Sequence, residues 1–404
     1  MTTTIINKNK KPNVPNSTDK GNVIRNLPNL RFPEFREEWE EHELSEYLDF
    51  KNGLNPKPNQ FGKGIKFISV MDILNNAVIT YDCIRASVSV SEEDMSAFSV
   101  QKGDILFQRS SETLEDVGRA NVYVDDIPAV FGGFVIRGKQ KTNYNPLFFK
   151  YLLSSPLARK RIIRMGAGAQ HFNIGQEGLS KVKLPFACID EQNKIAKILY
   201  LLDKRISLQN KIIEDLKKLK SAISKKLLCN DKWTTYKIQD IAEIGRGRVI
   251  SSVEIDRQKH PLYPVYSSQT SNDGIMGYLD NYMFDGEYIT WTTDGANAGT
   301  VFYRKGKFNC TNVCGTLKIQ PKFDCYFVSL VLQQATQKYV SSNLANPKLM
   351  NNTMASIKIR MPNIETQKQL SKVFQALDGC LLIHQRTCEM YLKEKQYLLR
   401  QMFI

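Results

Sequence analysis

The stretch EQNKIAKILYLLDKRISLQN (residues 191–210) is repeated as TQKQLSKVFQALDGCLLIHQ (residues 366–385), and this repetition decides the expected fold. The matching residues share an offset of 175 and include Gln192 with Gln367, Leu202 with Leu377, and Asp203 with Asp378. Each copy continues as an amphipathic pattern of about 38 residues, which corresponds to roughly 55 Å of helix. The sequence therefore predicts two long helices of common origin.

Both patterns place apolar residues in alternating steps of four and three, as a coiled-coil seam requires. Polar interruptions coincide as well, because Gln209 matches His384 and Lys220 matches Lys395. The two lysines mark either a polar break that fixes the helix register or a point where the seam opens toward another protein. The predicted seam residues are Ile195, Leu199, Leu202, Ile206, Ile213, Leu216, Leu370, Phe374, Leu377, Leu381, Tyr391 and Leu398.

The duplication extends upstream of the helices. Each helix follows a short basic run that ends in proline, KVKLP at 181–185 and IKIRMP at 357–362. Still earlier, EEWEEHELSEYLDFKNG (37–53) matches DKWTTYKIQDIAEIGRG (231–247). The segments between these landmarks hardly resemble each other, and they are rich in β-branched and aromatic residues broken by Gly and Asn turns. A common frame with divergent inserts is expected of two different recognition surfaces.

The predicted fold class is α/β, with two α/β domains joined by two long antiparallel helices that form a coiled-coil spacer in a pseudo-twofold tandem repeat. At 404 residues the chain is long enough for two cores. The expected parts are a flexible tail at 1–26, a first domain at 27–185, a first spacer helix at 186–230, a second domain at 231–362 and a second spacer helix at 363–404.

The charge balance indicates a polyanionic partner. The chain has 56 Lys and Arg against 41 Asp and Glu, a formal net charge of +15. Such an excess favours binding to nucleic acid, and improved solubility is the alternative. No apolar run approaches the roughly 18 residues of a membrane span, and the polar start has no signal-peptide pattern. The eight cysteines form no C-x-x-C pair, which suits a reducing cytoplasm.

Motifs for chemistry are missing from the sequence. There is no N/D-P-P-Y/F loop of an adenine methyltransferase, no nucleotide-binding P-loop and no nuclease motif. The four histidines form no metal-ligand pair. The sequence therefore predicts a chain that is not an enzyme by itself, with no catalytic residues, no metal site and no cofactor of its own.

Taken together, the duplicated Trp-containing units, the repeated P-x-EQ/TQ-x-L-LD helices and the basic inserts resemble the specificity subunit of type I restriction-modification systems. The opening LPNLRFPEFREEWEEHELSEYL (27–48) is similar to the start of such subunits from Gram-positive bacteria, and YPVYSSQTSNDGIMGYLDNY (263–282) is similar to a recurrent target-recognition domain. In the second helix Thr366 replaces Glu191, and Gly379-Cys380 replaces Lys204-Arg205.

This resemblance implies that each domain reads one half of a bipartite double-stranded DNA site. It also implies that the helices set the gap and dock two methyltransferase subunits, with restriction/translocase subunits as further partners. The methyltransferase would use S-adenosylmethionine, and the restriction subunit ATP and Mg. The alternative function is a non-catalytic scaffold protein that uses the helical rod for assembly.

Base reading favours Arg, Lys, Asn, Gln, Ser and Thr on loops. For any single residue, a solvated or turn-forming role is as plausible as DNA contact. The candidates in the first domain are Lys63, Gln108, Arg109, Ser110, Arg119, Gln170, His171 and Asn173. Those in the second domain are Arg246, Arg248, Ser267, Ser268, Gln269, Thr292, Thr293, Asn297, Asn346 and Lys348.

Overall fold

The computed structural model describes residues 26–168, 171–228, 230–341 and 346–404. Residues 1–25 of the predicted tail and the candidate Gln170 lie outside the described residues. The chain divides into two compact units: unit 1 comprises residues up to Leu208 together with Cys388–Ile404, and unit 2 comprises Gln209–Thr387. Each unit therefore contains one α/β domain and a segment of each long helix.

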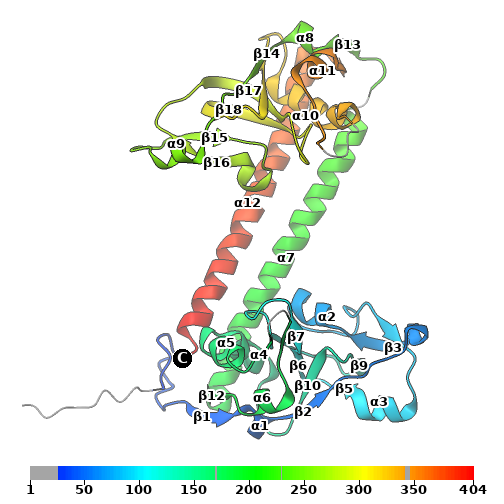
Figure 1. The fold of residues 1–404 in the computed structure, drawn as a ribbon, viewed down its shortest axis with the longest axis vertical. Helices are drawn as coiled ribbons and strands as arrows, with labels where there is room; N and C mark the ends of the chain where they lie inside the picture. Colours follow the sequence, from blue (N-terminus) through cyan, green and yellow to red (C-terminus); the bar gives the residue numbers. More distant parts are fainter. Residues whose placement is uncertain (1–25, 169–170, 229, 342–345) are drawn as a thin grey trace, which may run out of the picture. The chain divides into compact units, whose positions relative to one another are not determined.

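Unit 1 is built around two four-stranded sheets (Figure 1). The first sheet is antiparallel and has the order β2 (Leu48–Asn52), β10 (Val135–Gln140), β6 (Ile105–Gln108) and β8 (Ala120–Val122). The second has the order β4 (Ser87–Val88), β3 (Phe61–Ile68), β9 (Ala129–Phe131) and β5 (Ser99–Val100), with β3 and β9 parallel.

Among the described residues, this domain also has two short strand pairs, six short α-helices and the 3-10 turn η1 (Pro58–Gln60). The strand pairs are β1 (Glu40–Glu43) with β12 (Lys183–Phe186), and β7 (Ser110–Ser111) with β11 (Phe172–Asn173). The helices are α1 (Leu44–Tyr47), α2 (Val70–Asn75), α3 (Glu92–Phe98), α4 (Pro146–Ser154), α5 (Pro156–Ile163) and α6 (Gln176–Ser180).

Unit 2 repeats part of this plan around one six-stranded sheet. Its order is β14 (Ala242–Arg246), β19 (Cys314–Ile319), β17 (Phe284–Thr292), β18 (Val301–Cys310), β15 (Tyr263–Tyr266) and β16 (Ile275–Leu279). Unit 2 also has the strand pair β13 (Thr234–Lys237) and β20 (Lys358–Met361). Its short helices are α8 (Ile238–Ile241), α9 (Ser252–Asp256), α10 (Cys325–Ala335) and α11 (Asn351–Ser356), with the 3-10 turns η2 (Ser271–Gly274) and η3 (Thr336–Tyr339). The neighbours β14-β19-β17 correspond to β2-β10-β6, and β13-β20 corresponds to β1-β12.

The short helices α4 and α10 begin in the same way and pack on the matched tryptophans. Asn145 caps α4 and Asp324 caps α10, each through a side-chain oxygen that accepts backbone N–H groups of the first turn. The ring centroid of Trp39 lies 5.8 Å from that of a phenylalanine in α4. The ring centroid of Trp233 lies 6.0 Å from that of Phe327 in α10. Both tryptophans therefore belong to, or border, the core of their own domain.

The two long helices are α7 (Ile189–Leu227) and α12 (Ile364–Gln401). In each unit a segment of α7 runs antiparallel to a segment of α12. In unit 2 the contacts proceed from Gln209 with His384 to Lys220 with Asp378, so one residue number rises while the other falls. The predicted α/β class and helical spacer are confirmed.

All the predicted seam residues are buried or partly buried. Those nearest the domains also join the domain cores: Ile195 and Leu199 pack with unit 1, and Phe374 packs with unit 2. The helix ends are therefore part of the globular cores, and each helix segment packs as part of its own domain.

Candidate nucleic-acid interface

The repeated glutamine anchors each long helix to its domain by the same two hydrogen bonds. The side-chain oxygen of Gln192 accepts from the backbone N–H of Asn145 at 2.9 Å, and its amide donates to the carbonyl of Ala187 at 2.9 Å. Gln367 makes the equivalent bonds to Asp324 at 3.0 Å and to the carbonyl of Pro362 at 2.8 Å. Both glutamines are buried, so the repeat in the sequence reflects a repeated joint between helix and domain.

The repeated aspartate pairs with the repeated lysine of the other helix. In unit 1, Asp203 Oδ1 lies 2.5 Å from Lys395 Nζ, and in unit 2, Asp378 pairs with Lys220. The lysines that interrupt the two apolar patterns thus find their partners on the opposite helix. This contact favours the register-fixing interpretation of Lys220 and Lys395, because sliding either helix would separate the charges.

The unit 1 version of this pair is more deeply buried. Asp203 is 5% exposed and also accepts from Tyr151 Oη at 2.8 Å and Lys150 Nζ at 3.2 Å. Burial alone would raise the pKa of Asp203, but the ammonium groups of Lys150 and Lys395 and the hydrogen bonds lower it overall. Burial lowers the pKa of Lys150 to about 8 despite its aspartate partner. Asp378, whose side chain is 39% exposed, accepts from Tyr326 Oη at 2.5 Å.

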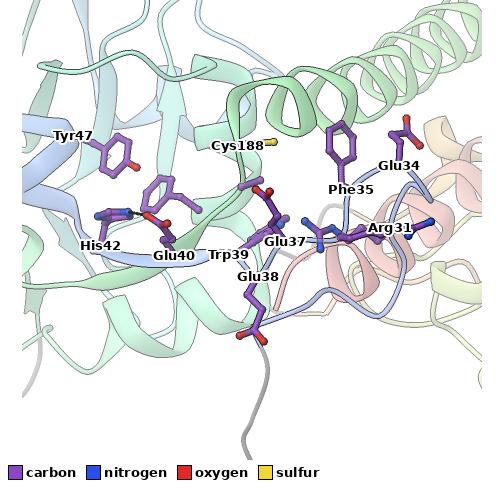
Figure 2. Close-up of a pocket in the computed structure, with 13 residues that line it drawn as sticks. Arg31, Glu34, Phe35, Glu37, Glu38, Trp39, Glu40, His42, Tyr47 and Cys188 are labelled. Carbon is purple, nitrogen blue, oxygen red and sulfur yellow. Dashed lines mark ion pairs between the residues drawn. The ribbon is translucent and has the colours of Figure 1, made fainter.

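Among the described residues, unit 1 has one contact between helix and domain that unit 2 lacks. Glu191 is fully buried and accepts two hydrogen bonds from Arg31 at 2.7 and 2.8 Å and one from the indole N–H of Trp39 at 3.1 Å. The hydrogen bonds from Arg31 to the Glu191 carboxylate raise the pKa of Arg31. Arg31 and Trp39 line a pocket of about 470 Å³ beside Cys188, at the start of α7 (Figure 2). Thr366 stands in place of Glu191 in the second copy, and Trp233 is correspondingly more exposed.

At the end of β6, unit 1 presents a polar cluster of Arg109, Ser110 and Asn173. Ser110 Oγ donates to Asn173 Oδ1 at 2.5 Å across the short β7–β11 pair, although the two residues are 63 positions apart. Arg109 Nη1 donates to the carbonyl of Gly133 at 3.2 Å, in the turn between β9 and β10. These side chains are partly or fully exposed, so donors and acceptors suited to base edges gather at one end of the sheet.

At the corresponding end of β17, unit 2 presents a charged cluster. Asp294 lies 3.2 Å from Arg246 and 3.7 Å from Lys348, and Arg246 also donates to Thr293 Oγ1 at 3.0 Å. The bridge between Asp294 and Lys348 occupies the place that the β7–β11 pair has in unit 1. Arg246 and Lys348 are exposed and carry positive charge, whereas unit 1 has Asn173 at the position that matches Lys348.

Comparison with known proteins agrees with this geometry. Residues 36–218 and 230–389 match the family described as type I restriction modification DNA specificity domain. The chain belongs to this family. Each match covers one copy of the duplicated frame, so the repeat identified in the sequence is a repeat of the family's domain.

Individual relatives bear the corresponding names. A type I specificity subunit from Mycoplasma pneumoniae is 36% identical over 230 residues, covering 54% of this chain and 90% of the relative. A second one from the same organism is 40% identical over 178 residues, covering 43% of this chain and 74% of the relative. The MjaX type I restriction enzyme specificity subunit from Methanocaldococcus jannaschii is 24% identical and covers 93% of this chain and 95% of the relative.

Among solved structures, the type I restriction-modification S subunit from M. genitalium has a TM-score of 0.68 at 17% identity, covering 94% of this chain and 99% of that chain. A chain from a structure of type I restriction-modification complex assembly has a TM-score of 0.51 at 12% identity, covering 89% and 96%. These likenesses establish the fold of the specificity subunit.

The other predicted DNA contacts of this specificity subunit that the structure describes fall into three groups: exposed, partly buried and buried. Lys63, Arg119, His171, Arg248 and Asn346 are exposed. Two of these arginines have acidic partners: Arg119 lies 2.6 Å from Asp116, and Arg248 lies 2.9 Å from Glu254. Ser267, Ser268, Gln269 and Asn297 are partly buried in one loop cluster, where Asn297 donates to the carbonyl of Ser268 at 3.0 Å.

Three predicted contacts are buried instead. Gln108 is 5% exposed, Thr292 is 1% exposed and Thr293 is fully buried. Gln108 donates to the carbonyl of Ser110 at 2.9 Å, and Thr293 accepts from Arg246. In this structure Gln108 and Thr293 support the neighbours that face solvent, because they lie at or next to strand ends with their side chains turned inward.

Sequence reasoning missed two residues that organise the unit 2 surface. Asp294 holds Arg246 and Lys348 together. Arg304 is 4% exposed, lies 3.6 Å from the ring centroid of Tyr266 and pairs with Asp273 at 2.6 Å, which orders the loop next to Gln269. The aspartate in TTDG was a usable signal, since a carboxylate between basic residues on strand-end loops can orient them.

Within the described residues, no cluster of three or more His, Cys, Asp or Glu side chains could hold a metal ion. Over the same part of the chain, no helix combines the length and the apolar character needed to cross a membrane.

Proposed function

We propose that this specificity subunit reads a bipartite DNA site, with each unit contacting one half-site through the strand ends of its sheet. The observation that carries the proposal is one repeated frame with two unlike ends, Arg109–Ser110–Asn173 in unit 1 and Arg246–Asp294–Lys348 in unit 2. The net charge of +15 supplies a sequence-independent attraction to DNA phosphates.

The long helices serve as the spacer in this proposal. Their segments are joined to each domain by a buried glutamine and to each other by a paired aspartate and lysine, so helix and domain would move as one body. A spacer with fixed register gives a fixed gap between the half-sites. The domain boundaries expected from the sequence, 27–185 and 231–362, are the recognition domains of this proposal.

Repeated apolar stripes on the spacer helices support two docking sites for one kind of partner. Ile198 is 40% exposed and its repeat Val373 is 46% exposed, and Leu208 is 57% exposed and its repeat Ile383 is 63% exposed. Ile198 and Leu208 are ten residues apart on α7, and Val373 and Ile383 are ten apart on α12. Positions ten residues apart lie within about 80° of each other around a helix, so the two residues on each helix share a face. Exposed apolar stripes kept in both copies fit two copies of a methyltransferase subunit.

The chain acts through its partners in this proposal, and it is not an enzyme itself. Methylation would come from the docked methyltransferase subunits with S-adenosylmethionine, and cleavage from restriction/translocase subunits with ATP and Mg. The expected site of action is the cytoplasm, where the DNA is.

Footprinting with the purified methyltransferase partner tests the reading of a split site. The expected result is protection of two short sequences separated by an unprotected or sequence-independent gap. Equal, weak binding to every duplex would reject sequence reading and favour a scaffold role.

Substitution in the stripes tests the docking. Leu208→Glu and Ile383→Glu should each remove one methyltransferase copy from the complex, and the double variant both, as measured by sedimentation. The matched control is Leu219→Glu, because Leu219 is 48% exposed but its repeat position is Glu394. Loss of both copies from one single variant would contradict two equivalent docking sites.

A further inference from the structure

The recognition end of unit 1 contains an apolar pocket that the polar candidates do not explain. The pocket has a volume of about 420 Å³ and its walls include Leu54, Phe61, Phe67, Met71 and Phe134. Three of these side chains reach solvent: Phe61 is 43% exposed, Met71 61% and Phe134 69%. Solvation of so much contiguous apolar surface is unfavourable, so a neighbouring group is expected to cover it when the protein works.

The backbone of the β9–β10 turn shapes the floor of the pocket. A Cβ on Gly132 would meet the ring of Phe67 at 2.7 Å, and a Cβ on Gly133 would meet Asn55 Oδ1 at 2.0 Å. Larger residues would therefore displace the walls. The two glycines keep the turn close to β3 and leave Phe134 projecting outward.

Groups that suit DNA surround this pocket. Ser110, which bonds Asn173, is one of the lining residues, and Arg109 bonds the carbonyl of Gly133 on the same turn. Lys57 and Lys63, which flank the lining residue Phe61 in the sequence, are exposed, and none of the lining residues is acidic. A polyanion is therefore the partner that the charge around the pocket favours.

The edges of base pairs in the major groove offer one apolar group, the C5-methyl of thymine. The pocket is larger than one methyl group, so it also has room for the pyrimidine edge that carries it. We propose that this pocket recognises the C5-methyl group of a thymine in the half-site read by unit 1. The inference rests on the proposed function, since it names the chemistry that one of the two readers detects.

Unit 2 offers an internal control at the matched position. The bridge between Leu54 and Gly132 in unit 1 corresponds to the bridge between Arg248 and Thr311 in unit 2. Arg248 is paired with Glu254, so a charged side chain stands where unit 1 has an apolar wall. Removal of thymine methyl groups should therefore affect the unit 1 half-site specifically.

The test replaces thymine by deoxyuridine, which lacks only the methyl group, at each position of each half-site in turn. Binding is measured with the complex of this subunit and its methyltransferase. At a contacted thymine, affinity should fall about fourfold, which corresponds to about 0.8 kcal/mol for burial of one methyl-sized group. The half-site read by unit 1 is identified by exchanging residues 250–350 for those of another specificity subunit, because that half of the sequence should stay unchanged.

Variants connect the effect to the pocket. Phe134→Ala and Met71→Ala should bind thymine and deoxyuridine duplexes equally, whereas Ile127→Ala, with a side chain 55% exposed outside the pocket, should keep the discrimination.

Three outcomes have distinct meanings. Equal binding of thymine and deoxyuridine by the unaltered complex overturns the inference and leaves split-site reading intact. Failure to find any specific site overturns the proposed function itself. Loss of methyltransferase binding by Phe134→Ala in the absence of DNA also overturns the inference, because the pocket would then be a protein-docking site.

Discussion

The two units keep the same contacts where the long helices begin and differ where the strands of the sheet end. Gln192 and Gln367 make the same two hydrogen bonds, and each repeated aspartate pairs with a repeated lysine. At the strand ends, a serine bonded to an asparagine in unit 1 corresponds to an aspartate that pairs with a lysine in unit 2. The contrast separates residues that the two copies of the frame share from residues that we propose to read DNA.

One frame contact differs between the units. Glu191 binds Arg31 and Trp39 in unit 1, whereas Thr366 takes its place in unit 2. Because both helices begin in the same way, this anchor is not required for the shared start of the helix.

The largest effect is expected from lengthening the spacer. A heptad inserted after Gln209 and another after His384 keep the aspartate–lysine pairs in register while adding about 10 Å, or roughly three base pairs. The recognised gap should grow by that amount and both half-sequences should stay the same, as shown by mapping methylated adenines. A heptad added to α7 alone is the control, and it should impair assembly because the register is broken. Altered half-sequences would contradict separate readers.

The paired aspartates should differ in their contribution to stability. Asp203→Asn leaves Lys150 and Lys395 near each other in a buried site, so it should cost about 3–5 kcal/mol of unfolding free energy. Asp378→Asn, at a more exposed pair, should cost about 1 kcal/mol or less. Urea unfolding measures both, and Asp215→Asn, on an exposed part of α7, is the neutral control. Equal losses would show that burial does not distinguish the two sites.

Of the two reciprocal substitutions at the unmatched anchor, only the one in unit 1 should change the free energy of unfolding. Glu191→Gln removes a charge-assisted pair with Arg31 and should cost about 2 kcal/mol. The reciprocal Thr366→Glu should stay within about 0.5 kcal/mol, since no arginine equivalent to Arg31 is bound there among the described residues. Thermal unfolding of both variants tests the pair. A marked gain in stability from Thr366→Glu would mean that a side chain of unit 2 can bind the new carboxylate, which would contradict this prediction.

The smallest effect concerns pH. The folded state holds the pKa of Asp203 below 3.8, so its ionised form stabilises unit 1. This contribution is fully present above the unfolded pKa and is lost as the pH falls through the lower folded value. The stability difference between the unaltered protein and Asp203→Asn should therefore shrink below about pH 4. A difference that stays constant down to pH 3 would contradict the assignment.

Much of the frame was predictable because the sequence contains two copies of it, and the copies can be compared with each other. The polar interruptions Gln209, His384, Lys220 and Lys395 were recognisable from their common offset. The structure shows Gln209 in contact with His384, and it pairs each lysine with an aspartate of the other helix. The matched tryptophans and the proline before each helix were equally visible. Periodicity and internal repetition can be detected in the sequence alone, without knowledge of the fold.

The strand ends that we propose to read DNA were harder to predict from the sequence, because their contacts join positions far apart in the chain. Ser110 and Asn173 are 63 residues apart, and Arg246 and Asp294 are 48 apart. Gln108 and Thr293 looked like loop residues, yet their side chains turn inward at strand ends. The apolar pocket depends on how β3, α2 and the β9–β10 turn meet, which no single segment encodes.

Exchange of residues 250–350 for the matching segment of another specificity subunit tests the central claim most directly. Methylated adenines are mapped across the host genome with the unaltered gene and with the exchanged one. One half of the recognised sequence should change, while the other half and the gap are retained. A change in both halves, or in neither, would show that the two units are not independent readers.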